Sequence, residues 1–143
     1  RLKNCLDHLI ERNYIVKQVR SSKGLHEMKH DEVTRPKHYV QNKSGIEVID
    51  ISKKLDFCNG NVVKYIARHQ HKGTPVVDLK KALQYWEWSV MPTMTTETRY
   101  NLEVFASCAP NPDRSLLNIF VRDWWYLGAA LRKTIKELED AEL

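Results

Sequence analysis

Apolar residues recur every three or four positions along most of the chain, which is the period of an amphipathic α-helix. Between the first two helical segments, residues 14–28 instead alternate as two short strands around a Ser-Lys-Gly turn. The pattern therefore predicts a mainly α, compact helical domain with a small N-terminal β-hairpin. Helices are predicted over 2–13, within 44–55, and over 59–71, 75–91, 95–109 and 111–143.

Local signals set the boundaries of the central helices. Asn59 or Asn61 can act as the N-cap of the helix that ends before Gly73. Thr74 is a suitable N-cap for the next helix, because Pro75 is favoured at a first helical position. The segment 44–55 is predicted to be a short helix, although its β-branched residues leave a strand open.

The last predicted helix, 111–143, is the longest, and its apolar residues form a heptad-like seam. Such a seam fits a subunit interface, so we expect a homo-oligomer built on this helix. The alternative is one helix that lies across its own domain. The seam consists of Leu116, Phe120, Trp124, Leu127, Leu131, Ile135 and Leu138.

A polar segment that contains Pro36 separates the N-terminal helix and hairpin from the rest. We therefore divide the chain into an appendage, 1–34, and a helical nucleotide-binding core with a C-terminal oligomerisation helix, 35–143. The appendage could also be the end of a winged helix.

The composition is that of an ordinary globular chain, with 42% hydrophobic and 29% charged residues among 143. A net charge of +5 favours anionic partners such as nucleotides or nucleic acid. The three cysteines, Cys5, Cys58 and Cys108, form no CxxC pair, so we expect free thiols and a reducing, cytoplasmic setting. No apolar run reaches the ~20 residues of a membrane span.

One face of the predicted helix 59–71 is basic. Lys64 and Arg68 lie on this face, and His71 and Lys72 continue it. Together with the free N–H groups of a helix N-terminus, these cations could bind phosphate. Lys80, Lys81 and Tyr85 lie on the next helix, which a short turn should bring alongside. A solvated basic face is the plainer interpretation.

Two further groups upstream could complete such a site. In "RPKHY", His38 and Tyr39 could hydrogen-bond or stack on a base. Glu47 and Asp50, three residues apart, could share a Mg²⁺ ion through water, or could be ordinary surface charges. The chain contains no GxxxxGK[ST] phosphate loop and no GxGxxG fingerprint, so any nucleotide site is of another kind.

Four segments, read in order, resemble a phage family of unknown-function domains. They are "PKHY", "IEVID", "GNVVKYIARHQHKG" and "DLKKALQYW", and they fall within residues 36–86. The family includes the phage T7 nucleotide kinase, which lacks a Walker A loop. The resemblance implies phosphoryl transfer from a nucleoside triphosphate to dTMP or dGMP in the bacterial host cytoplasm.

Residue roles follow from what phosphoryl transfer needs, namely positioning and charge neutralisation. We expect Lys64 and Arg68 at the transferred group, and Lys72 at the donor's outer phosphates. Asn61 would hold another phosphate oxygen, and Glu47 or Asp50 would hold Mg²⁺ or orient Arg68. His38 and Tyr39 would contact base or sugar. Asp78 would pair with Arg68 or Lys64, or would stabilise the start of its own helix.

Two other functions stay open. An all-α nucleoside triphosphate pyrophosphohydrolase uses several helical carboxylates around Mg²⁺, but a second acidic motif is missing from the core helices. A non-enzymatic nucleic-acid-binding phage protein would use the net positive charge and the N-terminal region.

Overall fold

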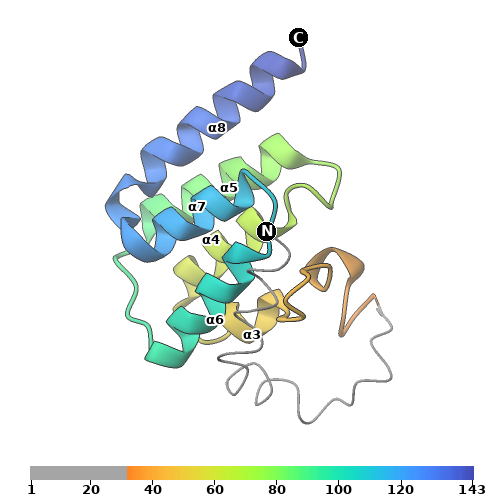
Figure 1. The fold of residues 1–143 in the computed structure, drawn as a ribbon. Helices are drawn as coiled ribbons and strands as arrows, with labels where there is room; N and C mark the ends of the chain where they lie inside the picture. The colour runs from red at the N-terminus through yellow and green to blue at the C-terminus, as the bar shows by residue number, and fades with distance from the viewer. Residues whose placement is uncertain (1–31) are drawn as a thin grey trace.

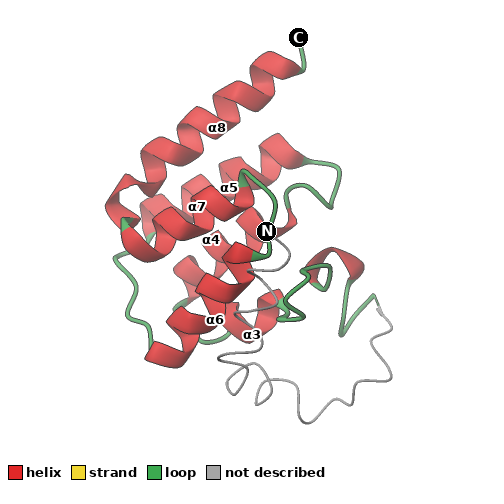
Figure 2. Ribbon diagram, viewed as in Figure 1, coloured by secondary structure: helices red, strands yellow, loops and turns green. Residues whose placement is uncertain are grey.

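The computed structural model describes residues 32–143, and this part of the chain contains helices but no strand (Figures 1 and 2). The prediction of a mainly helical fold is confirmed. The helix predicted over 2–13 and the hairpin over 14–28 lie outside the described residues. The elements are η1 (Lys37–Tyr39), α3 (Val48–Ser52), α4 (Phe57–Arg68), α5 (Pro75–Trp88), α6 (Thr96–Ser107), α7 (Asp113–Arg122), η2 (Trp124–Tyr126) and α8 (Leu127–Ala141).

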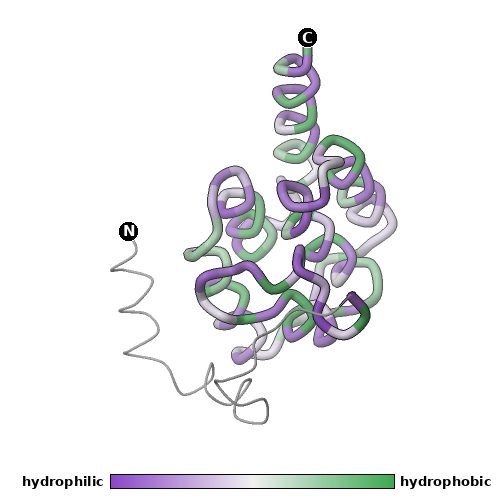
Figure 3. The backbone as a smooth tube through the Cα atoms, turned by 90° about the vertical axis from the view of Figure 1, so that its right-hand side faces the viewer, coloured by the Kyte–Doolittle hydropathy of each residue, from purple (hydrophilic) through white to green (hydrophobic). Residues whose placement is uncertain are grey.

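Helix α4 lies at the centre of the domain and packs against α3, α5 and α7. Its Val62, Val63 and Ile66 are fully buried. Helix α8 covers α5, and α6 packs against α7. The last turns of α8 extend beyond the other helices, with hydrophilic positions on much of their surface (Figure 3). The helices therefore pack around α4, and their apolar stripes meet in one core.

Helix α4 begins earlier than the sequence predicts. Asp56 is the N-cap, and its carboxylate accepts a hydrogen bond from the Asn59 backbone N–H at 2.9 Å. Neither Asn59 nor Asn61 is the cap, so that prediction is wrong. Gly60 faces α3, where an added Cβ would lie 2.7 Å from the Ser52 carbonyl oxygen. A glycine at this position therefore allows the close approach of α3 and α4.

The next boundaries agree with the local signals. Gly73 has a φ of 81°, Thr74 is the N-cap of α5, and Pro75 is at its start. Helix α6 is capped by Thr95, whose side chain accepts from the Thr98 N–H.

The predicted single helix over 111–143 is wrong. The chain leaves the helical conformation at Asp123, with φ −146° and ψ 58°, and a single 3₁₀ turn joins α7 to α8. Two hydrogen bonds hold the break: the Trp124 indole donates to Asn59 Oδ1 at 2.9 Å, and the Trp86 indole donates to the Trp124 carbonyl at 3.0 Å.

The heptad-like seam nevertheless lies on one side of both helices. Its residues are buried within this chain, except Leu138, which is partly buried against the same core. The seam therefore packs across its own domain, as in the alternative interpretation. Residues buried in this way cannot also face a second subunit.

None of the described helices combines the length and apolar character that crossing a membrane requires. Cys58 is a free cysteine, whereas Cys108 is disulfide-bonded, so the prediction of free thiols is wrong for Cys108.

Candidate functional site

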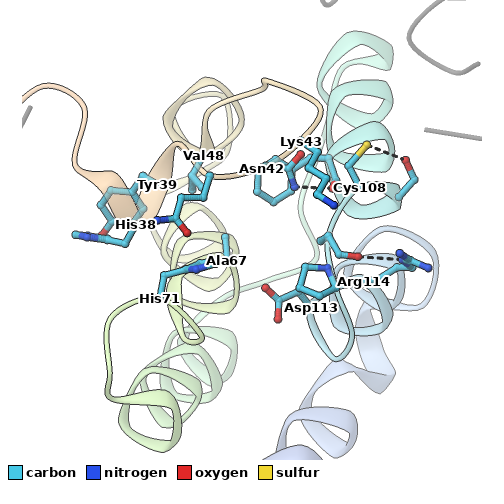
Figure 4. Close-up of a pocket in the computed structure, with 15 residues that line it drawn as sticks. His38, Tyr39, Asn42, Lys43, Val48, Ala67, His71, Cys108, Asp113 and Arg114 are labelled. Carbon is cyan, nitrogen blue, oxygen red and sulfur yellow. Dashed lines mark hydrogen bonds between the residues drawn. The ribbon is translucent and has the colours of Figure 1, made fainter. Parts of the chain in front are cut away.

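A pocket of about 430 Å³ lies where four segments of the core meet. Figure 4 shows His38, Tyr39 and His71 on one side, from η1 and the turn after α4. Lys43, Asp113 and Arg114 lie on the other side, from the following loop and the start of α7. The volume is within the range of small-molecule sites.

The pocket lining contains both apolar and basic side chains. Val48, Ala67 and Phe105 supply apolar surface. The lining also includes four basic residues, His38, Lys43, His71 and Arg114. The one carboxylate in the lining, Asp113, is buried, whereas Lys43 is exposed and Arg114 is half-buried, so the lining favours an anion.

The loop wall is held in place by Asn42. Its amide donates to the Phe105 carbonyl at 3.0 Å, across to the end of α6. Its side-chain oxygen accepts from the Ser44 backbone N–H at 2.9 Å, which closes the turn around Lys43. The neighbouring lysine is therefore placed by fixed backbone rather than by a free loop.

His38 lies in a positive environment. Burial lowers the pKa of His38, and the charges of Lys72 and Arg68 lower it further. Its ring also packs against Tyr39, with centroids 4.2 Å apart. His38 is therefore neutral near pH 7, and a bound anion would favour its protonation.

Arg68 does not line the pocket but lies behind Tyr39, which does. Its guanidinium makes two hydrogen bonds of 3.0 Å to the Asp78 carboxylate and donates to the Tyr39 hydroxyl at 3.1 Å. Asp78 is fully buried, and its hydrogen bonds raise the pKa of Arg68. The predicted pairing of Asp78 with Arg68 is confirmed. Arg68 is not among the residues that line the pocket.

Asp113 forms a buried polar cluster beside the pocket. The Gln70 amide donates to Asp113 Oδ1 at 2.7 Å, and His69 Nδ1 lies 3.5 Å from the same oxygen. Burial raises the pKa of Asp113 to about 7 and lowers the pKa of His69. His69 Nδ1 is also 2.6 Å from the Ile66 carbonyl, so this histidine has a hydrogen-bond partner within the core.

Three other predicted site residues lie outside the pocket, on the joined surface of α4 and α5. The Lys64 and Lys81 ammonium groups lie 4.5 and 5.5 Å from the centre of the Tyr65 ring. Tyr85 stacks on the same ring, with centroids 5.8 Å apart. The structure therefore separates these residues from His38 and Tyr39, which line the pocket.

The remaining predicted phosphate ligands are dispersed. The Asn61 amide donates to the Phe57 carbonyl within α4, one turn past the N-terminus, so free N–H groups do not surround it. Lys80 is paired with Glu139 of α8 at 3.5 Å. Lys72 lies close enough to affect His38.

The two carboxylates predicted for Mg²⁺ have separate cationic partners. Glu47 contacts Arg35 at 2.7 Å, and both side chains are largely buried. Asp50 contacts Lys53 at 3.3 Å. Between residues 32 and 143, no group of three or more His, Cys, Asp or Glu side chains is arranged to hold a metal. A shared Mg²⁺ site does not fit this arrangement, and Mg²⁺ stays a prediction from sequence.

Several pocket residues were missed by sequence reasoning. Lys43 and Arg114 belong to segments 71 positions apart, and nothing in the local pattern joins them. His71 carries a signal, because it extends the basic face of α4. Asp113 lies directly after Asn111-Pro112, which the sequence shows only as a helix start.

Comparison with known proteins gives one match. A family model described as a protein of unknown function (DUF3310) matches residues 33–87, from just before η1 to the end of α5. This range includes the four resembling segments and half of the pocket wall. No curated protein and no solved structure matches the chain.

Proposed function

We propose that the protein is a nucleotide-binding phosphotransferase that forms a diphosphate from dTMP or dGMP and a nucleoside triphosphate. One observation carries the proposal: an apolar pocket of about 430 Å³ is bordered by four basic side chains, His38, Lys43, His71 and Arg114. A nucleotide has the matching character, since it joins a flat base to a phosphate. The resemblance in residues 36–86 supplies the reaction class.

The pocket suggests which residues meet each part of the nucleotide. Tyr39 and Phe105 offer aromatic surface to a base. His71, Lys43 and Arg114 would neutralise the phosphate, and Lys72 would meet the donor from the side of His38. Phosphoryl transfer needs mostly such positioning and charge neutralisation.

The proposal changes three predicted roles. Arg68 is a positioning residue, because Asp78 holds its guanidinium and it in turn holds the Tyr39 hydroxyl. Lys64 and Lys81 are left out of the nucleotide site, since they lie on the α4–α5 surface. No step is assigned to Mg²⁺.

The test is a radiolabel assay with labelled dTMP or dGMP and a panel of nucleoside triphosphates. We expect labelled diphosphate, and a loss of about 10- to 100-fold in kcat/KM for His71→Ala and for Lys43→Ala, the cost of one charged hydrogen bond. Lys133→Ala, a cation on exposed α8, is the matched control and should leave the rate unchanged.

Two results would overturn the proposal. Absence of diphosphate with every donor, with the triphosphates intact, would remove an enzymatic role in nucleotide metabolism. Pyrophosphate released from a triphosphate alone would favour the pyrophosphohydrolase.

Homo-oligomerisation also stays a proposal. With the seam buried, the exposed apolar residues that a second copy could use near α8 include Trp125 and Tyr126. Light scattering over a range of protein concentrations would show whether they do.

A further inference from the structure

A second surface, on the other side of Arg68 from Tyr39, has a chemistry that the nucleotide pocket does not use. We define the α4–α5 strip as Phe57, Lys64, Tyr65, Lys81, Tyr85 and Trp88. Phe57 and Lys64 are seven residues apart on α4, and Lys81 and Trp88 are seven apart on α5, so each pair shares one helix face. Because α4 and α5 pack side by side, the two faces form one surface.

Aromatic rings in the strip form a connected group around Tyr85. Tyr85 stacks on Tyr65 at 5.8 Å with 15° between the ring planes. Phe57 and Trp88 contact Tyr85 edge to face, at 5.8 and 5.6 Å. Phe57 is 75% exposed and Trp88 is 65% exposed, so both present ring surface to a ligand.

Two cations, Lys64 and Lys81, lie among these rings. Among the described residues, neither Lys64 nor Lys81 is within salt-bridge distance of a carboxylate, in contrast to Lys80 and Arg68. The acidic residues in and beside the strip are already engaged, and Asp78, three positions before Lys81, pairs with Arg68. Asp56 accepts hydrogen bonds from Asn59, and Glu87 pairs with Arg132 of α8.

This combination of features identifies a ligand class. Exposed rings with a π-face accept any stacked base, and interleaved lysines neutralise the phosphates between bases. A purely apolar partner would leave Lys64 and Lys81 desolvated without compensation. We propose that the α4–α5 strip binds single-stranded nucleic acid, with bases on Phe57 and Trp88 and the backbone along Lys64 and Lys81.

The test uses the whole chain and a fluorescein-labelled oligothymidylate of about 15 nucleotides, with anisotropy measured over a series of salt concentrations. We expect binding at low salt that weakens as salt rises. Trp88→Ala should weaken it by about 5- to 100-fold, the loss of one stacked base. Lys64→Ala/Lys81→Ala should reduce the magnitude of the salt slope by about 1.4, or ~0.7 for each phosphate contact on a single strand.

Matched controls lie elsewhere on the surface. Trp125 is 71% exposed on η2, outside the strip, and Trp125→Ala should keep full affinity. Lys133→Ala/Lys136→Ala removes two cations from exposed positions of α8 and should keep the slope. Circular dichroism of each variant confirms the fold, and saturating dTMP should not displace the oligonucleotide, because the nucleotide pocket is separate.

Three outcomes would overturn the proposal. The first is no binding at low salt, and the second is an equal loss in Trp88→Ala and Trp125→Ala. The third is self-association, seen by light scattering and abolished by Trp88→Ala, without oligonucleotide binding, which would assign the strip to a second copy of the chain. None of these results depends on phosphoryl transfer, so this proposal and the kinase proposal can fail separately.

Discussion

Substitution of Asp78 should lower the free energy of unfolding far more than substitution of an exposed carboxylate. The Asp78 side chain is 1% exposed and holds Arg68 through two hydrogen bonds of 3.0 Å. Asp78→Ala removes two of the three hydrogen bonds described for the Arg68 guanidinium and leaves the one to the Tyr39 hydroxyl. The guanidinium then stays largely buried without its carboxylate. Loss of one member of a buried ion pair costs about 3 to 5 kcal/mol.

Urea unfolding, followed by circular dichroism and tryptophan fluorescence, measures this cost. A cycle of Asp78→Ala, Arg68→Ala and the double variant should give a coupling of about 2 to 3 kcal/mol, because the double variant leaves no unpaired charge. The matched control is Glu87–Arg132, which has the same 3.0 Å contact but is exposed. Its cycle should give under about 1 kcal/mol.

A cost below about 1 kcal/mol for Asp78→Ala would refute the reasoning, since the buried pair would then behave like a surface pair. The expected result also has a practical consequence. Arg68→Ala would lose activity through loss of fold, so His71 and Lys43 are better positions for testing the site.

Three further predictions follow from other parts of the core. Burial raises the pKa of Asp113 to about 7 from 3.8, so the folded state holds a proton that the unfolded chain releases, and stability falls as pH rises through that window. The free energy of unfolding of Asp113→Asn, measured relative to the native chain, should therefore rise by about 2 to 3 kcal/mol from pH 5 to pH 8. If the difference in free energy between the two proteins were the same at both pH values, this prediction would be contradicted. His38 should titrate below its usual pKa of 6.5 in NMR spectra and above that lowered value once dTMP is bound; an unchanged pKa would exclude a phosphate near its ring. Gly128→Ala should destabilise the fold by about 1 to 3 kcal/mol despite alanine's better helix propensity, because the new Cβ would lie 2.4 Å from the Trp86 ring. Thermal unfolding measures this effect, and a Tm equal to or above that of the native chain would show that the Trp86 ring moves aside.

Local signals in the sequence predicted those parts of the fold that local chemistry decides. Gly73 with its positive φ, Thr74 at the N-cap position and Pro75 in the first turn mark the start of α5 within three adjacent residues. The break after α7 has no such signal, because it depends on the bond between Trp124 and Asn59, residues 65 positions apart. The heptad-like pattern also continues across the break, since one 3₁₀ turn keeps the apolar residues facing the core.

The same distinction explains the candidate site. His38 and Tyr39 could be found from a short motif, and they do line the pocket. Lys64 and Lys81 were expected beside them. The helical period shows on which face of a helix a residue lies, but it does not show how far that face is from a loop elsewhere in the chain. Lys43, Asp113 and Arg114 reach the pocket through the packing of α6 and α7, which no single segment encodes.

Because α8 covers α5, the burial of α5 must wait during synthesis until α8 has been made. Helix α5 ends at residue 88 and α8 begins at residue 127, so about 40 residues separate the helix from its cover. At ribosomal rates of about 5 to 20 residues per second, this gap lasts about 2 to 8 seconds. For that time the nascent chain has no α8 to cover α5, which makes this apolar face a natural target for cotranslational chaperones.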